Sequence, residues 1–312
     1  MSDDLYDVLI IGGGPAGLTA GLYSSRAKLK TLLVERMILG GQVMTTTKVE
    51  NYPGFPGGID GPDLMIRFQE HCHEFGLENI TGEVTALSDR GSEKLVTIDD
   101  RQVRARAVII TTGAEPSKLG IPGETELTGR GVSYCATCDG AFFRNVPVAI
   151  VGGGDTAAEE ALFLTRFASK VYLVHRRDEL RATKLLQERI FANDKVEPAW
   201  NSVVKEVIGD NTGVTKLSLY NLKEQTEREI EVAGMFVAIG VTPKAHFLAD
   251  ILDMDQDGYI LTDSECRTSM PGVFAAGDVR KKILKQIATA VGDGAVAAIV
   301  AEKYLDELNL DQ

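Results

Sequence analysis

The first part of the chain alternates short apolar runs with longer mixed stretches in a regular order. The apolar run Val8–Ile11 leads into a glycine-rich loop and then into a helix-like stretch that extends to about Lys28. A second apolar run, Thr31–Glu35, follows. Short apolar runs bounded by glycine predict buried strands, and the longer stretch between them predicts a helix. This segment therefore reads as a β-α-β unit.

The same order returns in the middle of the chain. Val146–Gly152 leads through a second glycine-rich loop into a helix-like stretch from Ala157 to Ala168, and then into the apolar run Lys170–His175. Gly12 to Glu35 spans 35 − 12 = 23 residues, and Gly152 to His175 spans 175 − 152 = 23 residues. The chain thus contains two β-α-β units of equal dimensions.

Each unit carries a glycine pattern typical of dinucleotide binding. The first loop runs from Gly12 to Gly17 with Gly14 between them, and the second runs from Gly152 through Gly154 to Ala157. The first glycine permits a tight turn, the second lets a pyrophosphate approach the backbone, and the third position stays small for helix packing. A diphosphate is then stabilised at a helix N-terminus. One such loop could be a turn that binds nothing, but two copies in the same context favour two nucleotide sites.

The residues that close the second strands distinguish the two sites. Glu35 is a carboxylate suited to accept hydrogen bonds from ribose hydroxyls, as in FAD or NAD. The second unit has His175-Arg176-Arg177 at that place, with Arg181 further on. Arginine side chains can hold a 2′-phosphate, so this site is predicted to bind NADPH. The alternative interpretation is a solvated basic start of a helix.

Three further stretches complete each half of the chain. Val108–Gly113 ends the first half and Met235–Gly240 the second, while Gly272–Asp278 precedes a helical run from about Gln286 to Leu305. That last run has no nucleotide loop of its own, so it must pack on an existing sheet.

The predicted fold class is α/β, with two Rossmann-like, three-layer nucleotide-binding domains. The first domain is discontinuous, residues 1–116 and 244–312, and the second, residues 117–243, is inserted into it. Pro116 and Pro243 mark the junctions, because proline ends a strand and favours a turn. These junctions are the expected hinges.

Cys135-Ala-Thr-Cys138 is followed by Asp139, and the second glycine loop begins 152 − 138 = 14 residues after Cys138. Such a pair can be half of a zinc site, a redox dithiol, or two buried thiols. A structural zinc needs four ligands, and the other candidate cluster, His71–His73, places consecutive residues of a helix in different directions. A dithiol beside two nucleotide sites suggests electron transfer from a nucleotide to a disulfide. Asp139 would act as acid and base, or else cap a turn.

Composition narrows the function classes. A net charge of −12 and an aromatic content of 6% disfavour a nucleic-acid partner. Met1–Asp7 is acidic, unlike a signal peptide, and the apolar runs are too short to span a bilayer. We therefore expect no membrane association. Four cysteines in such a chain suggest a reducing cytoplasm, where a disulfide is catalytic more often than structural.

Over nearly its whole length the chain resembles the bacterial-type, low-molecular-weight thioredoxin reductases. Cys135–Gly140 matches the active-site motif of that family, and Gly152–Ala157 with His175–Ala182 matches its NADPH site. Further matches are the flavin-contacting loops Gly40–Gln42 and Glu50–Gly54, the ribityl-binding segment Gly277–Val279, and the flavin-edge contact Lys285–Ile287. The chain departs from the family at Lys285–Ile287, where the family often has Arg-Gln-Ala, and at Arg280–Lys282, which could alter partner affinity.

The resemblance implies an NADPH-dependent flavoenzyme that passes electrons through FAD to the Cys135–Cys138 disulfide and on to thioredoxin. It also implies a homodimer. Because the nicotinamide site and the dithiol both lie on the inserted domain while there is one flavin, we expect that domain to rotate about the two proline hinges between half-reactions. The competing hypotheses are a glutaredoxin-like or peroxiredoxin-type acceptor, ferredoxin as the donor, and a non-catalytic redox sensor.

The catalytic residues expected are Cys135, Cys138 and Asp139. The expected FAD contacts are Gly12, Gly14, Pro15, Ala16, Gly17, Glu35, Arg36, Gly40, Gly41, Gln42, Asn51, Thr112, Gly113, Gly277, Asp278, Lys285, Gln286 and Ile287. The expected NADPH contacts are Gly152, Gly154, Asp155, Thr156, His175, Arg176, Arg177, Arg181, Ile239 and Gly240, and no metal ligand is expected.

Overall fold

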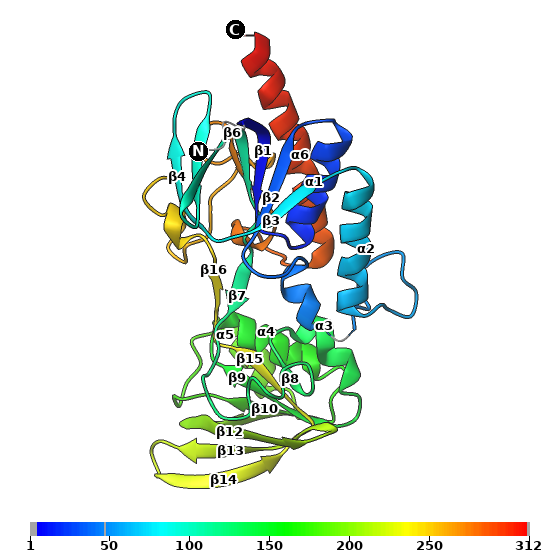
Figure 1. The fold of residues 1–312 in the computed structure, drawn as a ribbon. Coiled ribbons are helices and arrows are strands. Elements are labelled where there is room, and N and C mark those ends of the chain that lie inside the picture. Colours follow the sequence, from blue (N-terminus) through cyan, green and yellow to red (C-terminus); the bar gives the residue numbers. More distant parts are fainter. Residues whose placement is uncertain (1–4, 47, 311–312) are drawn as a thin grey trace. The chain divides into compact units, whose positions relative to one another are not determined.

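The chain divides into two compact units in a computed structural model that describes residues 5–46 and 48–310. Unit 1 comprises the described residues up to Glu115 and from Thr242 onward, and unit 2 is the continuous segment Pro116–Val241 (Figure 1). Met1–Asp4, the acidic start considered above, lies outside the described residues.

Unit 1 is built on one mixed sheet. Its strands follow the order β3-β2-β1-β6-β5-β4, and β17 also pairs with β6. The pairs among β1, β2, β3, β6 and β17 are parallel, whereas β4 and β5 pair antiparallel. The strands are β1 (Leu5–Ile11), β2 (Thr31–Glu35), β3 (Glu78–Thr81), β4 (Val84–Asp89), β5 (Lys94–Ile98), β6 (Arg101–Ile110) and β17 (Val273–Ala275).

Both faces of this sheet are covered, which explains the uninterrupted apolar run of β1. Val8 and Ile10 belong to a core shared with helices α1 and α6, while Leu9 and Ile11 belong to a second core on the other face. The helices are α1 (Pro15–Arg26), α2 (Gly61–Glu74) and α6 (Ile287–Leu310), and the short 3-10 turns are η1 (Gly41–Thr45), η3 (His246–Leu248) and η4 (Gly277–Val279).

Unit 2 has a parallel sheet of order β11-β10-β9-β15-β8 and a separate antiparallel sheet of order β12-β13-β14. The first consists of β8 (Val132–Ser133), β9 (Pro147–Gly152), β10 (Lys170–Val174), β11 (Val196–Ala199) and β15 (Gly234–Ala238). The second consists of β12 (Ser202–Asp210), β13 (Gly213–Asn221) and β14 (Thr226–Glu231).

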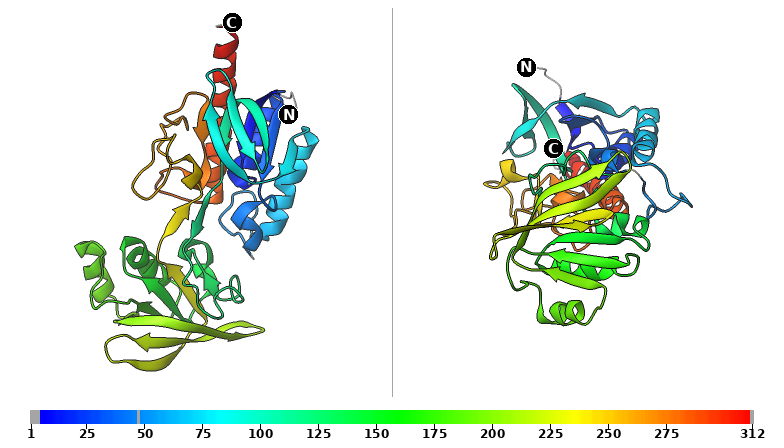
Figure 2. Two further views of the ribbon diagram at one scale, coloured as in Figure 1. Left: turned by 60° about the vertical axis from the view of Figure 1, so that its left-hand side comes forward. Right: turned by 90° about the horizontal axis from the view of Figure 1, so that it is seen from below.

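The parallel sheet of unit 2 lies between two layers. Val148 and Ile150 of β9 face a core with the helices, whereas Ala149 and Val151 face a core shared with the antiparallel sheet. Figure 2 shows the antiparallel sheet in yellow-green along one side of the green strands. The helical segments are α3 (Ala136–Asp139), α4 (Asp155–Leu164), α5 (Lys184–Phe191) and the 3-10 turn η2 (Gly140–Phe142).

The two passages of chain that join the units correct one expectation. Pro116 and Pro243 do not stand in turns, because each ends a short strand, β7 (Ala114–Pro116) or β16 (Val241–Pro243), and these strands pair with each other. Proline is tolerated at the end of an edge strand, where its missing N–H leaves no ladder bond unmade. The connection is therefore an extended two-stranded ribbon.

The predicted β-α-β units are confirmed, with α1 ending at Arg26 and α4 ending at Leu164. The last helix is longer than predicted, since α6 continues to Leu310. Strands β12–β14 are not among the predicted elements. Within residues 5–46 and 48–310, no helix is long and apolar enough to cross a membrane.

Candidate functional site

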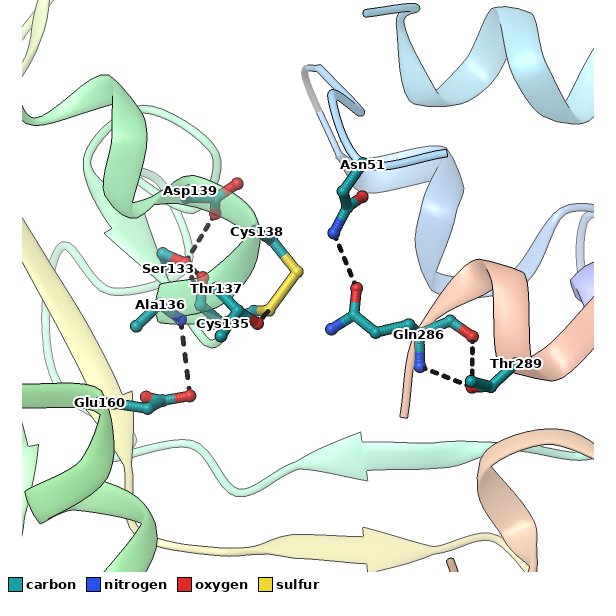
Figure 3. Close-up of a disulfide and its surroundings, with 10 residues drawn as sticks. All are labelled: Asn51, Ser133, Cys135, Ala136, Thr137, Cys138, Asp139, Glu160, Gln286 and Thr289. Atoms are coloured by element: carbon teal, nitrogen blue, oxygen red, sulfur yellow. Dashed lines mark hydrogen bonds between the residues drawn. A yellow bond between two sulfur atoms is a disulfide. The ribbon is translucent and has the colours of Figure 1, made fainter. Parts of the chain in front are cut away.

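The Cys135-x-x-Cys138 pair forms a disulfide in unit 2, with the two Cα atoms 5.3 Å apart. Cys135 follows β8 and has an extended backbone at the start of α3. The amides of Cys138 and Asp139 donate hydrogen bonds to the Cys135 carbonyl at 3.2 and 3.1 Å. This single turn of helix brings both sulfur atoms to one side, where they bond to each other (Figure 3). Both cysteines are half-buried.

Asp139 is the acidic group of this segment. Its Oδ2 accepts a hydrogen bond of 2.6 Å from the hydroxyl of Ser133. Burial raises the pKa of Asp139 above its ordinary value, and the Ser133 hydrogen bond opposes that rise. A carboxyl group held in this way can keep or release a proton closer to neutral pH than a solvated aspartate, as acid-base catalysis needs.

A second carboxyl group approaches the disulfide segment from α4, and sequence reasoning missed it. Glu160 accepts a hydrogen bond of 3.5 Å from the amide of Ala136, the residue after Cys135 (Figure 3). Burial raises the pKa of Glu160 to about 7. A signal existed, since Glu160 lies three residues after Ala157 and four before Leu164, both buried, and thus on the buried face of the helix.

The glycine loop of unit 2 combines tight packing with open space. A Cβ on Gly152 would press on the carbonyl oxygen of Ala238, and one on Gly153 would overlap the ring of His175. Gly154, at the start of α4, has no heavy atom within 4 Å of such a Cβ. The loop thus offers free space at a helix N-terminus, as a bound pyrophosphate requires.

The basic residues after β10 separate into two roles. His175 is buried, its Nε2 has no hydrogen-bond partner among the described residues, and its ring packs against Gly153 of the loop. Arg176, Arg177 and Arg181 are exposed, and the part of the chain that the structure describes gives none of the three an ion pair. Burial lowers the pKa of His175, and the charges of these three arginines lower it further, so all three stand close to its ring. The group fits the 2′-phosphate of NADPH.

The glycine loop of unit 1 is closely packed at Gly17 and has open space at Gly14. A Cβ on Gly17 would overlap the carbonyl oxygen of Gly12, whereas one on Gly14 would be 4.0 Å from the Cα of Gly41. Glu35, at the end of β2, accepts hydrogen bonds from the amides of Gly13 at 2.7 Å and Met37 at 3.0 Å. Its carboxylate is thereby fixed beside the loop, as ribose recognition requires.

The C-terminal segment meets this loop. Gly277 has a positive φ of 80°, and a Cβ there would be 2.9 Å from that of Ala16. Its amide donates to Asp293 at 3.0 Å. Asp278 is next to it with Oδ1 buried, and burial raises its pKa. This buried carboxyl group beside the loop, whose Oδ1 has the Lys282 ammonium 3.4 Å away, fits a ligand hydroxyl, as the ribityl chain of FAD would supply.

The departure from the family pattern at Arg280–Lys282 has a structural meaning. Lys282 is only 12% exposed and pairs with Asp293 at 3.1 Å and with Asp278 at 3.4 Å. Arg280 is 13% exposed and also pairs with Asp293, at 3.2 Å. Both side chains therefore serve the interior of unit 1, and in the Arg280–Lys282 run Lys281 is the residue that stands exposed.

Other expected FAD contacts are linked within unit 1. Asn51 donates to Gln286 at 2.9 Å, which joins two segments far apart in sequence (Figure 3). Gln42 donates to the carbonyl of Ala114, and Thr112 donates to that of Lys244 at 2.6 Å. Pro15 starts α1 and Ile287 starts α6, beside Gln286.

Five expected contacts stand somewhat apart from these clusters. Arg36 pairs with Glu83 at 3.7 Å and both side chains are exposed. In unit 2, Ile239 is exposed after β15, and Gly240 accepts a hydrogen bond from Ser117 at 2.9 Å. Asp155 accepts one from the amide of Thr183 at 2.6 Å, and Thr156 beside it is exposed.

Two nucleotide-type units and a Cys-x-x-Cys disulfide in one of them define a pyridine-nucleotide-dependent disulfide oxidoreductase. The chain belongs to the pyridine nucleotide-disulphide oxidoreductase family, whose model matches residues 6–294.

Its relatives narrow the family further. The chain is 50% identical over 306 residues to a protein named thioredoxin reductase from Listeria innocua, covering 98% of this chain and 96% of that one. A crystal structure of thioredoxin reductase from Streptococcus pyogenes is 48% identical, with a TM-score of 0.95 over 98% of this chain and 100% of that one. A Lactococcus lactis thioredoxin reductase structure described as the FR conformation is 47% identical, with a TM-score of 0.67 over 97% and 99%.

Proposed function

We propose that this protein is an NADPH-dependent thioredoxin reductase with FAD as its bound cofactor. The observation that carries the proposal is the Cys135–Cys138 disulfide in the same unit as the three arginines of a 2′-phosphate site. Relatives that share half of the sequence over almost the full chain bear the name thioredoxin reductase. The proposal assigns FAD to unit 1 and NADPH to unit 2.

Each cofactor has residues suited to hold it. In unit 1, Glu35 would hold a ribose, the Gly12–Gly17 loop a pyrophosphate, and Asp278 the ribityl chain. In unit 2, the Gly152–Gly154 loop would hold the pyrophosphate of NADPH and the arginines its 2′-phosphate. When bound, the two cofactors supply hydride transfer, which no side chain provides.

The protein's own part in the chemistry lies in the disulfide. Two electrons and two protons convert the Cys135–Cys138 S–S bond into two thiols, and Asp139 is the group placed to handle a proton. One cysteine thiolate then attacks the disulfide of thioredoxin, which forms a mixed disulfide and releases one partner thiolate. The second cysteine attacks the mixed disulfide, so the partner leaves as a dithiol and the Cys135–Cys138 bond is restored.

The layout of the sites calls for movement. The nicotinamide site and the disulfide both belong to unit 2, yet each must come within about 3–3.5 Å of the same flavin. We therefore include in the proposal a rotation of unit 2 about the β7–β16 ribbon. Two family structures of almost equal identity to this chain match it with TM-scores of 0.95 and 0.67, which supports more than one arrangement within the family.

A crosslink tests the rotation. If the two connecting segments are immobilised, NADPH oxidation and disulfide reduction should not both continue at full turnover. Full rates of both half-reactions in the crosslinked protein would contradict the rotation and leave the assigned activity intact.

Homodimeric assembly and a cytoplasmic location complete the proposal. The homodimer follows the family resemblance, and sedimentation of the holoenzyme measures it. Two free cysteines, Cys72 and Cys266, are compatible with a reducing compartment.

The function is tested by mixing the holoenzyme with NADPH in a stopped-flow instrument and then adding an oxidised acceptor. We expect flavin bleaching by NADPH and reduction of thioredoxin in preference to glutaredoxin. Absence of bleaching would support a non-catalytic redox sensor, and equal use of both acceptors would broaden the substrate. Flavin bleaching by reduced ferredoxin and not by NADPH would contradict the assignment of NADPH as the electron donor.

A further inference from the structure

Ser133 lies between the two chemical groups of the site, although no motif singles it out. It ends β8, directly before Tyr134 and Cys135, and it is only 5% exposed. Its Oγ accepts a hydrogen bond of 3.1 Å from the Cys135 amide and donates one of 2.6 Å to Asp139 Oδ2. The Cys135 carbonyl oxygen is a second acceptor for the same hydroxyl, at 3.4 Å (Figure 3).

A serine hydroxyl carries one hydrogen, so it can serve only one of these two acceptors at a time. When Asp139 is ionised, the shorter and charge-assisted bond to its carboxylate prevails. When Asp139 is protonated, its own O–H can donate to Ser133 Oγ, which frees the serine hydrogen for the Cys135 carbonyl. Buried hydroxyls change acceptor in this way at little cost, because every polar atom keeps a partner.

We infer that Ser133 is a positioning residue that links the proton of Asp139 to the backbone of Cys135. It holds the Asp139 carboxyl group against the disulfide segment. When Asp139 gains a proton, the Ser133 hydroxyl changes its acceptor to the Cys135 carbonyl. This inference rests on the proposed function, because it takes Asp139 as the acid-base group of the dithiol.

The surroundings leave few other ionisable groups to account for the coupling. Strand β8 and turn η2, which adjoin α3, carry none. From α4 the carboxyl group of Glu160 reaches the Ala136 amide, and Glu159 lies exposed beside it. The Ser133 hydroxyl donates directly to Asp139, and this hydrogen bond opposes the rise in the pKa of Asp139 that burial causes.

The test follows Asp139 directly in the holoenzyme. Oxidised-minus-reduced infrared difference spectra are recorded against pH, and the band of the protonated carboxyl is assigned by its loss in Asp139→Asn. In Ser133→Ala the midpoint of this band should move upward by about half to one pH unit, because the hydrogen bond that favours the ionised form is lost. Ser133→Thr, which keeps the hydroxyl, should stay within a few tenths of the wild type.

Ser202→Ala is the matched control. Ser202 is also buried in unit 2, at 3% exposed, but it lies on β12 of the antiparallel sheet, and its hydroxyl donates to the Trp200 carbonyl. It should leave the Asp139 midpoint unchanged. If Ser133→Ala does not fold, Ser133→Val and Ser133→Thr form an isosteric pair that differs only in the hydroxyl.

An unchanged midpoint in Ser133→Ala, or in the valine variant relative to threonine, overturns the inference. Thioredoxin reduction by the wild type is measured in parallel. If the wild type does not reduce thioredoxin but Ser133→Ala still shifts the Asp139 midpoint, thioredoxin is not the acceptor and the role of Ser133 is still supported.

Discussion

At the scale of single residues, Glu160 shows how burial changes a carboxyl group. Removal from water raises its pKa from 4.5 to about 7, the Ala136 amide opposes this, and the charge of Glu159 adds to it. The folded protein therefore holds this proton at a pH where the unfolded chain has lost it. Stability from this source is present at low pH and falls as pH rises from about 4.5 to about 7.

The variant Glu160→Gln tests that sign. It removes the ionisation and keeps an acceptor for the Ala136 amide, so we expect it to be more stable than the wild type by about 1–3 kcal/mol near pH 8. The gain should vanish near pH 4. Denaturant unfolding at fixed FAD concentration measures both, and Glu159→Gln is the control, because Glu159 is exposed. An equal gain at the two pH values would contradict the burial argument.

The four cysteines should react differently with an alkylating reagent. Cys72 and Cys266 are 2% and 1% exposed, and burial raises their pKa values to about 12 and about 11. In the folded, reduced protein we therefore expect iodoacetamide to label Cys135 and Cys138 at least a hundredfold faster. Mass spectrometry of the peptides measures this, with urea-unfolded protein as the control. Early labelling of Cys72 or Cys266 would show that their surroundings open in the native state.

At the scale of elements, the strand–loop–helix turns divide their glycines between folding and binding. In the loop between β9 and α4, Gly152 is enclosed by Ala238 and Ala157, whereas Gly154 faces open space. The backbone of Gly154 has a φ of −94°, which alanine can adopt. One glycine of the motif thus serves the fold, and the other leaves the space that the proposed pyrophosphate site needs.

Two alanine variants separate these roles. Gly152→Ala should destabilise the protein by about 2 kcal/mol or more, because its methyl group presses on a backbone carbonyl. Gly154→Ala should keep the melting temperature within a few degrees and raise the KM for NADPH about tenfold or more. Thermal melts and steady-state kinetics check the pair. If both variants bind NADPH as tightly as the wild type, the loop is not the pyrophosphate site.

The arginines after β10 form the proposed 2′-phosphate site, so we expect them to select the nucleotide donor. Replacing Arg176 and Arg177 with alanine should lower kcat/KM for NADPH by about 10–100-fold, since each arginine contributes a charge-assisted hydrogen bond to the 2′-phosphate. The value for NADH should hardly change. Arg189→Ala, an exposed arginine on α5, is the matched control. A parallel loss with both donors would indicate a role other than phosphate recognition.

What could be predicted from the sequence follows from the range of each interaction. Glu35 and the arginines stand at strand ends that the apolar pattern makes visible, and the Cys-x-x-Cys spacing alone brings its sulfur atoms onto one helical turn. Glu160 reaches the Ala136 amide across 24 residues of sequence. Ser133 contacts the Cys135 amide and the Asp139 carboxylate, contacts that depend on the local backbone conformation. Neither leaves a spacing signature. The prediction of turns at Pro116 and Pro243 was wrong because β7 and β16 are separated in sequence by the whole inserted unit. A rule based on neighbouring residues cannot detect such a pairing.

At the scale of the whole molecule, the two units are organised differently along the chain. Unit 2 is continuous and has its own cores on both faces of its sheet, whereas unit 1 is assembled from two segments. A segment with complete cores satisfies the usual condition for independent folding.

We therefore expect the fragment Pro116–Val241 to fold alone. It should show a cooperative thermal transition and the Cys135–Cys138 disulfide, and bind NADPH without FAD. Circular dichroism and calorimetric titration with NADPH, with NADH as control, measure these properties. A fragment without a cooperative transition would mean that unit 2 depends on unit 1 for its stability.

The pairing of β7 with β16 brings the entry and the exit of the inserted segment side by side. A segment with adjacent ends can be exchanged for another without rebuilding the host around it. Because the arginines of the proposed NADPH site and the Cys135–Cys138 disulfide both lie within that segment, a single crossover pair in the gene would transfer the donor site and the redox disulfide together. The host would keep its flavin while a new electron route is installed, which gives protein engineering a natural cassette boundary.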